Sequence, residues 1–252
     1  LTLGLILFTQ HKPYARHIVQ FLVGGYMLIY LGIICGENMQ IEGFWYYLFL
    51  GVFEAATIHY AVAKIFGPLL FGRGWCGYAC WTAMVLDLLP YQTPQAPRRE
   101  HLGKLRYLLF TLALLFVASL FLFEVENKDK IMWYSFLIGN MVYYIAGIAL
   151  TYVFHDNRAF CKYLCPITVF LKAASRFSLM RICCDETTCI SCGKCRKVCP
   201  MNVEPDQPFT VRANRTECIL CLECVENCPK GALELSLKTS RSKQSGGEKR
   251  KA

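Results

Sequence analysis

The cysteines of this chain are the residues whose type and spacing point most directly to chemistry. Eight of the fifteen form two runs with the spacing C-x2-C-x2-C-x3-C-P. The runs are Cys189, Cys192, Cys195 and Cys199 before Pro200, and Cys218, Cys221, Cys224 and Cys228 before Pro229. Closely spaced cysteines in a reducing compartment bind metal more often than they form disulfides. Three thiolates on one tight loop can reach three corners of an iron-sulfur cubane, so the runs predict two 4Fe-4S clusters, with two zinc sites as the alternative.

This segment resembles a bacterial-type two-cluster ferredoxin throughout its length. In such ferredoxins the fourth cysteine of each run ligates the other cluster, because the proline turns the chain across. The resemblance implies that Cys189, Cys192, Cys195 and Cys228 hold cluster 1. It implies that Cys218, Cys221, Cys224 and Cys199 hold cluster 2.

A second cysteine motif occurs twice. Arg73-Gly-Trp-Cys76-Gly-Tyr-Ala-Cys80 aligns with Arg158-Ala-Phe-Cys161-Lys-Tyr-Leu-Cys165 at a constant offset, and each copy follows a pair of apolar stretches. Residues four apart project from the same face of a helix, so each C-x3-C motif can present two sulfur atoms in one direction. Two such pairs would supply four thiolates, enough for a third 4Fe-4S cluster.

Three interpretations of the C-x3-C cysteines stay open: a third cluster, redox-active dithiols, or packing cysteines. Pro166 suits the first turn of a following helix, whose positive end would favour thiolates nearby. Arg73 and Arg158 could offset the negative charge of a ligated cluster. Cys183 and Cys184 lie outside both runs and are interpreted as spare thiols.

The elements that must position these cysteines are apolar helices. The chain is 55% hydrophobic with a mean hydropathy of +0.34, too apolar for an ordinary soluble domain. Four stretches approach the roughly 20 residues that cross a bilayer: His17 to Cys35, Phe44 to Ala63, Tyr107 to Phe123 and Ile131 to Phe154. We therefore expect an all-α membrane domain of four transmembrane helices in two pseudo-repeated hairpins, followed by a small α+β ferredoxin domain.

The domain organisation and orientation follow from composition and charge. Residues 1–180 are expected to form the transmembrane domain, residues 181–235 the ferredoxin domain, and residues 236–252 a basic, disordered tail. Lysines and arginines border the first helix and fill the segment between the second and third, so both termini and the ferredoxin domain should be cytoplasmic at the inner membrane. The net charge of +9 is that of membrane-protein loops facing lipid headgroups, and nucleic-acid binding is not expected.

Two ionisable residues inside the predicted second span, Glu54 and His59, are candidates for a quinone site. Charged groups at a bilayer centre cost about 2.5–3.5 kcal/mol, and quinol oxidation needs acceptors for two protons. The structural alternative is that both only hold helices together by hydrogen bonds. Lys64 is close enough to the end of the span to extend to the membrane surface. Haem has little support, because His59 is the only histidine well inside a span, with His17 and His155 at the edges.

The whole pattern resembles the NapH-type membrane ferredoxins, which are related to the NosR-type and CcoG-type proteins. The resemblance is carried by four spans, G-R-x-x-C-x3-C after the second, R-x-x-C-x3-C-P after the fourth, and the terminal double run. Trp81 departs from it, since the family normally has proline there. The resemblance implies an electron-transfer subunit that links the quinone pool to partner redox subunits of a membrane complex. The alternative is an assembly or regulatory protein that reduces a metal or senses redox state.

Overall fold

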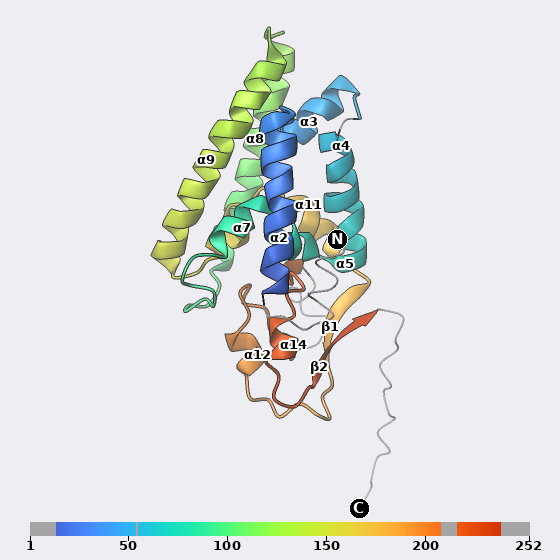
Figure 1. Cartoon of the computed structure of the whole chain (residues 1–252), viewed down its shortest axis with the longest axis vertical. Coiled ribbons are helices and arrows are strands. Elements are labelled where there is room, and N and C mark those ends of the chain that lie inside the picture. Colours follow the sequence, from blue (N-terminus) through green and yellow to red (C-terminus); the bar gives the residue numbers. More distant parts are fainter. Residues whose placement is uncertain (1–13, 54, 208–215, 238–252) are drawn as a thin grey trace, which may run out of the picture.

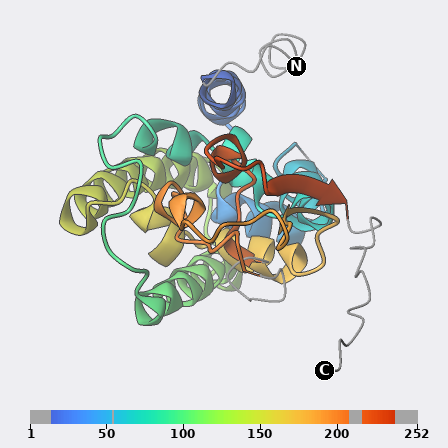
Figure 2. The ribbon, with the colours of Figure 1, turned by 90° about the horizontal axis from the view of Figure 1, so that it is seen from below.

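The computed structural model describes residues 14–53, 55–207 and 216–237. Long, roughly parallel helices form one end of the molecule, and a small part with short helices and two strands caps the other end (Figure 1). Seen along the helices, this cap overlies the middle of the bundle (Figure 2). Glu54 and residues 238–252 of the expected tail lie outside the described residues.

The first half of the helical part runs up and down once. Helix α2 (Ala15–Gly25) continues as π-helix η1 (Tyr26–Ile34), and α3 (Ile41–Leu50) follows at the far end. The chain returns through α4 (Ala55–His59), π-helix η2 (Tyr60–Phe66) and α5 (Gly67–Phe71). Two short helices, α6 (Gly74–Tyr78) and α7 (Trp81–Leu86), complete this half.

The second half repeats that plan. After the 3-10 helix η3 (Glu100–Lys104), α8 (Leu105–Leu122) and α9 (Lys128–Phe154) form an antiparallel pair. Short helices α10 (Ala159–Tyr163) and α11 (Thr168–Ser175) come next, as α6 and α7 do in the first half. The repeated cysteine motif is therefore a repeated structural unit: a helical hairpin followed by two short helices.

Among the residues that the structure describes, three helices are long and apolar enough to cross a membrane: Ala15–Ile34, His101–Leu122 and Lys128–Phe154. The prediction of one continuous span from Phe44 to Ala63 is wrong. Helix α3 ends at Gly51, which has φ of +70° and caps the helix in the left-handed region that favours glycine. The next apolar helix, Thr57–Phe71, begins and ends closer to Cys76 in the sequence than the predicted span did. It is also shorter than the other three apolar helices.

The cap contains helices α12 (Lys194–Lys197) and α14 (Glu223–Glu226) and an antiparallel pair of strands. Strand β1 (Met180–Cys184) pairs with β2 (Leu233–Leu237), with Met180 opposite Leu237 and Cys184 opposite Leu233. The sheet closes the segment that carries both cysteine runs. One buried apolar cluster contains Cys76 and Leu171 from the helical part and Met201, Val203 and Ile219 from the cap, so the two parts share a core.

Candidate iron-sulfur sites

Two cavities in the cap are lined by the cysteines of the two runs. One is walled by the sulfur-bearing residues Cys199, Cys218, Cys221 and Cys224. The other is walled by Cys189, Cys192, Cys195 and Cys228, with Cys184 beside them. Within the described part of the chain, no three His, Cys, Asp or Glu side chains converge closely enough to hold a single metal ion. Four thiols around a cavity are the set that a cubane cluster needs. The two groups are the sets that the ferredoxin resemblance implies. The assignment of these cysteines as cluster ligands is still a prediction.

The backbone of the two runs follows the same path. Three pairs of equivalent residues have positive φ: Ser191 and Leu220 (51° and 52°), Gly193 and Leu222 (70° and 66°), Asn202 and Gly231 (53° and 61°). Non-glycine residues adopt such angles rarely and at a cost, so the shared pattern indicates a constrained loop.

The fourth cysteine of each run receives a backbone hydrogen bond. The N–H of Val203 donates to Sγ of Cys199 and the N–H of Ala232 to Sγ of Cys228, both at 3.3 Å. For Cys228 the slight burial raises the pKa, but the N–H groups around the sulfur outweigh it and lower the pKa below its ordinary value. For Cys199 the burial is deeper, so desolvation outweighs the N–H donors and raises the pKa above its ordinary value.

The four C-x3-C cysteines lie close together where the short helices meet, although the two cysteines of a pair do not share a helix. Helix α6 ends at Tyr78, so Cys80 is the extended residue before α7, and Cys165 likewise follows the end of α10. The prediction that each pair shares one face of a helix is therefore wrong. Cys80 and Cys165 nevertheless pack against the buried cluster that contains Cys161, and Cys165 interacts electrostatically with Cys161, Cys80 and Cys76.

Burial decides how these thiols behave without a metal. Desolvation raises the pKa of Cys161 to about 12, despite the positive charge of Arg158. Desolvation likewise raises the pKa of Cys165. The reactive form of cysteine is the thiolate, so these thiols are poor redox dithiols at neutral pH. As cluster ligands they would be deprotonated by the iron itself.

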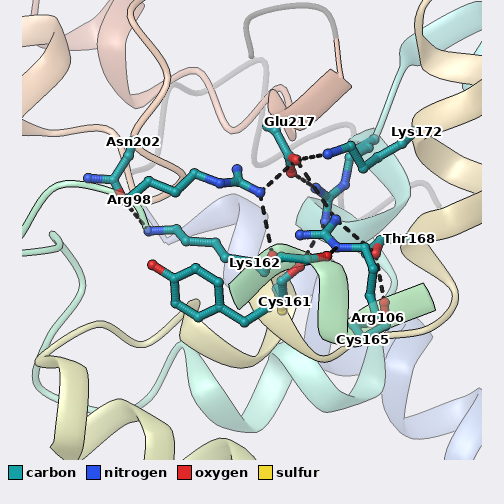
Figure 3. A network of polar contacts seen from close by, with 12 residues as sticks. Arg98, Arg106, Cys161, Lys162, Cys165, Thr168, Lys172, Asn202 and Glu217 are labelled. Atoms are coloured by element: carbon teal, nitrogen blue, oxygen red, sulfur yellow. Dashed lines mark hydrogen bonds and ion pairs between the residues drawn. The ribbon is translucent and has the colours of Figure 1, made fainter. Parts of the chain in front are cut away.

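A buried carboxylate that the sequence analysis did not single out links the cap to the helical part. Glu217 directly precedes Cys218 and is paired with four cations. Figure 3 labels Arg98, Arg106 and Lys172 among them. They are Arg73, Arg98 (2.7 Å), Lys172 (2.5 Å) and Arg106 (3.8 Å). Burial alone would raise the pKa of Glu217, but these charges outweigh it and lower the pKa to about 2. Only its position beside a predicted ligand could have drawn attention to it.

A second ion pair holds the other arginine of the repeat. Asp87 accepts hydrogen bonds from Arg158 at 2.5 Å and from Arg16 at 3.1 Å. Burial raises the pKa of Asp87, but the charges of Arg158 and Arg16 outweigh it and lower the pKa below its ordinary value. Each cysteine motif of the repeat therefore begins with a buried arginine that has a carboxylate counterion.

The residue that directly follows the first cysteine of each C-x3-C motif contacts the cap. At Gly77 a Cβ atom would lie 2.7 Å from the carbonyl oxygen of Ile219, so only glycine allows this approach. The equivalent residue, Lys162, donates to Asp156 at 2.7 Å and also to Asn202. The glycine brings the Cys76 loop against the Cys218 run, and the lysine reaches the segment after Cys199 (Figure 3).

His59, the described member of the candidate quinone pair, lies beside the C-x3-C cysteines. Its ring is 5.0 Å from the ring of Trp75, the neighbour of Cys76, and its Nε2 is buried without a hydrogen-bond partner among the described residues. Lys64 does not extend to the surface as expected: it is 2% exposed, and its Nζ lies 4.9 Å from the Trp75 ring centroid. His17 and His155 lie at helix ends, as expected.

Comparisons with known proteins agree with this geometry. A 4Fe-4S dicluster domain family matches residues 188–233. A 4Fe-4S binding domain family matches residues 58–92 and 132–182, and each of these segments contains one C-x3-C motif. No solved structure matches.

Relatives with similar sequences include uncharacterized and ferredoxin-type proteins. Uncharacterized protein MJ0749 of Methanocaldococcus jannaschii is 29% identical over 222 residues, covering 84% of each chain. Methylamine utilization ferredoxin-type protein MauN of Methylobacillus flagellatus is 25% identical over 61% of this chain, which spans 58% of its length. Putative electron transport protein YccM of Escherichia coli is 39% identical over 22% of this chain and 16% of its own length. The chain thus carries ferredoxin-type 4Fe-4S domains and is homologous to MauN-like and YccM-like ferredoxin proteins, which supports iron-sulfur electron transfer.

Proposed function

We propose that this chain is a membrane-bound subunit that relays single electrons between the quinone pool and partner redox subunits. The observation that carries the proposal is the position of Cys76. It packs in one buried cluster with Cys199, Cys218 and Cys221, the cysteines of the nearer cap cavity. The thiols of the helical part therefore adjoin those of the cap, as the parts of an electron path must.

In this proposal Cys76, Cys80, Cys161 and Cys165 hold a third 4Fe-4S cluster. The charges around these cysteines support a bound anion. Arg73 and Glu217 belong to a group of four cations and one carboxylate, and Arg158 and Asp87 to a group of two cations and one carboxylate. Both groups have surplus positive charge, although buried charges are normally balanced. Four thiolates around iron would supply the missing negative charge, whereas four neutral thiols would not.

The clusters would supply one-electron chemistry, which lets a two-electron quinone couple be divided into single steps. The fold of the protein sets the order in which electrons would pass between the three cysteine groups. The C-x3-C group lies nearest the apolar helices, the cavity of Cys218 lies next to it, and the cavity of Cys189 lies in the cap beyond. We place partner redox subunits at that outer cavity.

We assign the quinone end to His59, with Glu54 as its companion. A quinol gives up two protons with its two electrons, and an imidazole nitrogen without a partner can accept one. The unpartnered Nε2 of His59 and its closeness to Trp75 and the C-x3-C group support this role. The membrane topology proposed with it has four spans, of which Thr57–Phe71 is the short one, and places both termini and the cap in the cytoplasm at the inner membrane.

The decisive experiment counts iron and sulfide in the anaerobically purified protein and in Cys76→Ser, with a redox titration followed by electron spin resonance. Three clusters predict about twelve iron atoms per chain, and loss of one predicts about eight. Cys35→Ser, at an exposed position, is the matched control. An unchanged iron count in Cys76→Ser contradicts the third cluster.

The quinone link is tested separately. In His59→Leu, reduction of the clusters by a soluble quinol should slow at least tenfold, while reduction by dithionite stays normal. His155→Leu is the control, because it places the same change at the end of α9. Equal rates of cluster reduction in His59→Leu and in the unmodified protein would contradict the quinone assignment. Purification of the chain without stoichiometric redox partners would favour the alternative function, an assembly or regulatory protein.

A further inference from the structure

Lys64 is a buried cation that has no carboxylate partner in the described part of the chain. It lies in π-helix η2 with 2% of its surface exposed, and its Nζ sits over the Trp75 ring at 4.9 Å. Arg73 and Arg158, which are as deeply buried, are paired with Glu217 and Asp87. No salt bridge joins Lys64 to any acidic side chain among the described residues.

A buried ammonium group without a counterion costs several kcal/mol. An aromatic ring returns about 2 kcal/mol when the cation is desolvated, so Trp75 offsets only part of that cost. Lysine keeps its proton in such a site only where negative charge lies close by, since it otherwise becomes neutral. Its described electrostatic partners are the sulfur atoms of Cys80, Cys76 and Cys165. Neutral thiols would leave the cation unbalanced, whereas ligated thiolates would balance it.

We infer that Lys64 is the counter-cation of the C-x3-C group and sets the reduction potential of the cluster held there. This inference rests on the third cluster of the proposed function. A positive charge in a water-poor site favours the more negative, reduced state, and interactions of this kind tune iron-sulfur potentials. Trp75 acts as a positioning residue, because its ring holds the ammonium group beside Cys76.

The inference also explains an asymmetry between the repeated halves. Arg73 and Arg158 also interact with the sulfur atoms, but each is paired with a carboxylate of the surrounding fold as well. Lys64 has no carboxylate partner in the described structure, and the groups of negative charge that it interacts with are the sulfur atoms. Its removal should therefore change the electron affinity of the site more than it changes the fold.

The experiment is a redox titration of the purified holoprotein with spin-resonance detection, comparing Lys64→Met with Lys64→Arg. We expect Lys64→Met to lower the equilibrium constant for reduction of one cluster at least tenfold, which is about 59 mV for one electron. Lys64→Arg should keep the original midpoint, because it keeps the charge. Lys130→Met, at an exposed position at the start of α9, should leave all midpoints unchanged.

The outcomes separate this inference from the function it rests on. If the unmodified protein holds about eight iron atoms and Cys76→Ser holds the same number, the third cluster fails and the inference fails with it. If about twelve are present and Lys64→Met has an unchanged midpoint, only the inference is overturned. If Lys64→Met loses iron, the Lys64→Arg variant separates the two explanations. A normal iron content and a normal midpoint in Lys64→Arg support the role of the charge. An equal loss of iron in Lys64→Arg overturns that role and shows that Lys64 acts by packing.

Discussion

Arg158 donates a hydrogen bond of 3.0 Å to the carbonyl oxygen of Cys76, the first cysteine of the other half of the repeat. Arg73 makes the reciprocal bond to the carbonyl oxygen of Cys161 at 3.4 Å. Both arginines are buried, so their guanidinium groups need hydrogen-bond partners inside the protein, and each finds one in the other half of the repeat. The exchanged bonds join the two halves where their cysteines meet, which fixes the four sulfur atoms relative to one another.

Glu217 should be the main ionic link between the cap and the helical part. Glu217→Gln would leave Arg73 and its neighbouring cations without their shared carboxylate. Loss of one partner from a buried pair costs about 3–5 kcal/mol, so we expect a clearly lower midpoint of thermal unfolding in detergent. Glu226→Gln, at an exposed position, is the control. Equal midpoints for both variants would show that the cation group is stable without Glu217.

The same residue predicts a dependence of stability on pH. The folded-state pKa of Glu217 is about 2, below its ordinary value of 4.5. A lowered pKa contributes stability that is complete above 4.5 and is lost as the pH falls toward 2. Between about pH 5 and pH 3 the thermal midpoint of the unmodified protein should fall more steeply than that of Glu217→Gln. Parallel curves would contradict the assignment.

Gly77→Ala should separate the C-x3-C group from the nearer cap cavity. The new Cβ would lie 2.7 Å from the Ile219 carbonyl oxygen, closer than such atoms approach, so one of the two loops must move. We expect at least tenfold slower electron exchange between the two sites at unchanged iron content, measured by rapid-freeze spin resonance after reductant is added. Gly25→Ala, which meets nothing within 4 Å, is the control. Unaltered exchange in Gly77→Ala would argue against this path.

Removal of iron should unfold the cap and spare the helices. Its helices α12 and α14 have four residues each, and the buried cluster around them is largely Cys195, Cys224 and Leu233. The strands pack on this small cluster and not on the core shared with the helical part, so metal binding should supply most of the energy that folds this end of the cap. Amide hydrogen exchange in β1 and β2 should lose its protection after chelation under oxidising conditions, while α8 and α9 stay protected. Retained protection in the strands would show a cap that folds without metal.

Trp81, where the resembled family has proline, should stabilise the contact with α9. Its indole N–H donates to Oδ1 of Asn140 at 2.9 Å, and the side chain is 3% exposed. Trp81→Phe leaves a buried acceptor without its donor, which costs about 1–3 kcal/mol. The half-buried Trp133→Phe is the control for thermal unfolding. A smaller loss at Trp81 than at Trp133 would contradict the structural role.

The local spacing of the sequence determined which residues are candidates for iron ligation, because a thiolate loop around a cubane needs fixed separations. It also determined the internal repeat and the presence of long apolar helices, since both are properties of contiguous segments. Within these segments, however, the sequence did not reveal where α3 ends. Gly51 is one glycine in an apolar stretch, and only the packing of α3 shows that it stops the helix.

The tertiary structure alone decided how distant segments balance their charges. Glu217 collects cations from four separate segments, and Lys64 is turned inward over Trp75 although its length would let it reach the surface. It also showed that Cys80 and Cys165 lie beyond the ends of their helices. The physical reason is that counterion choice and burial depend on which groups the fold brings together, and local spacing contains no information about partners far away in the chain.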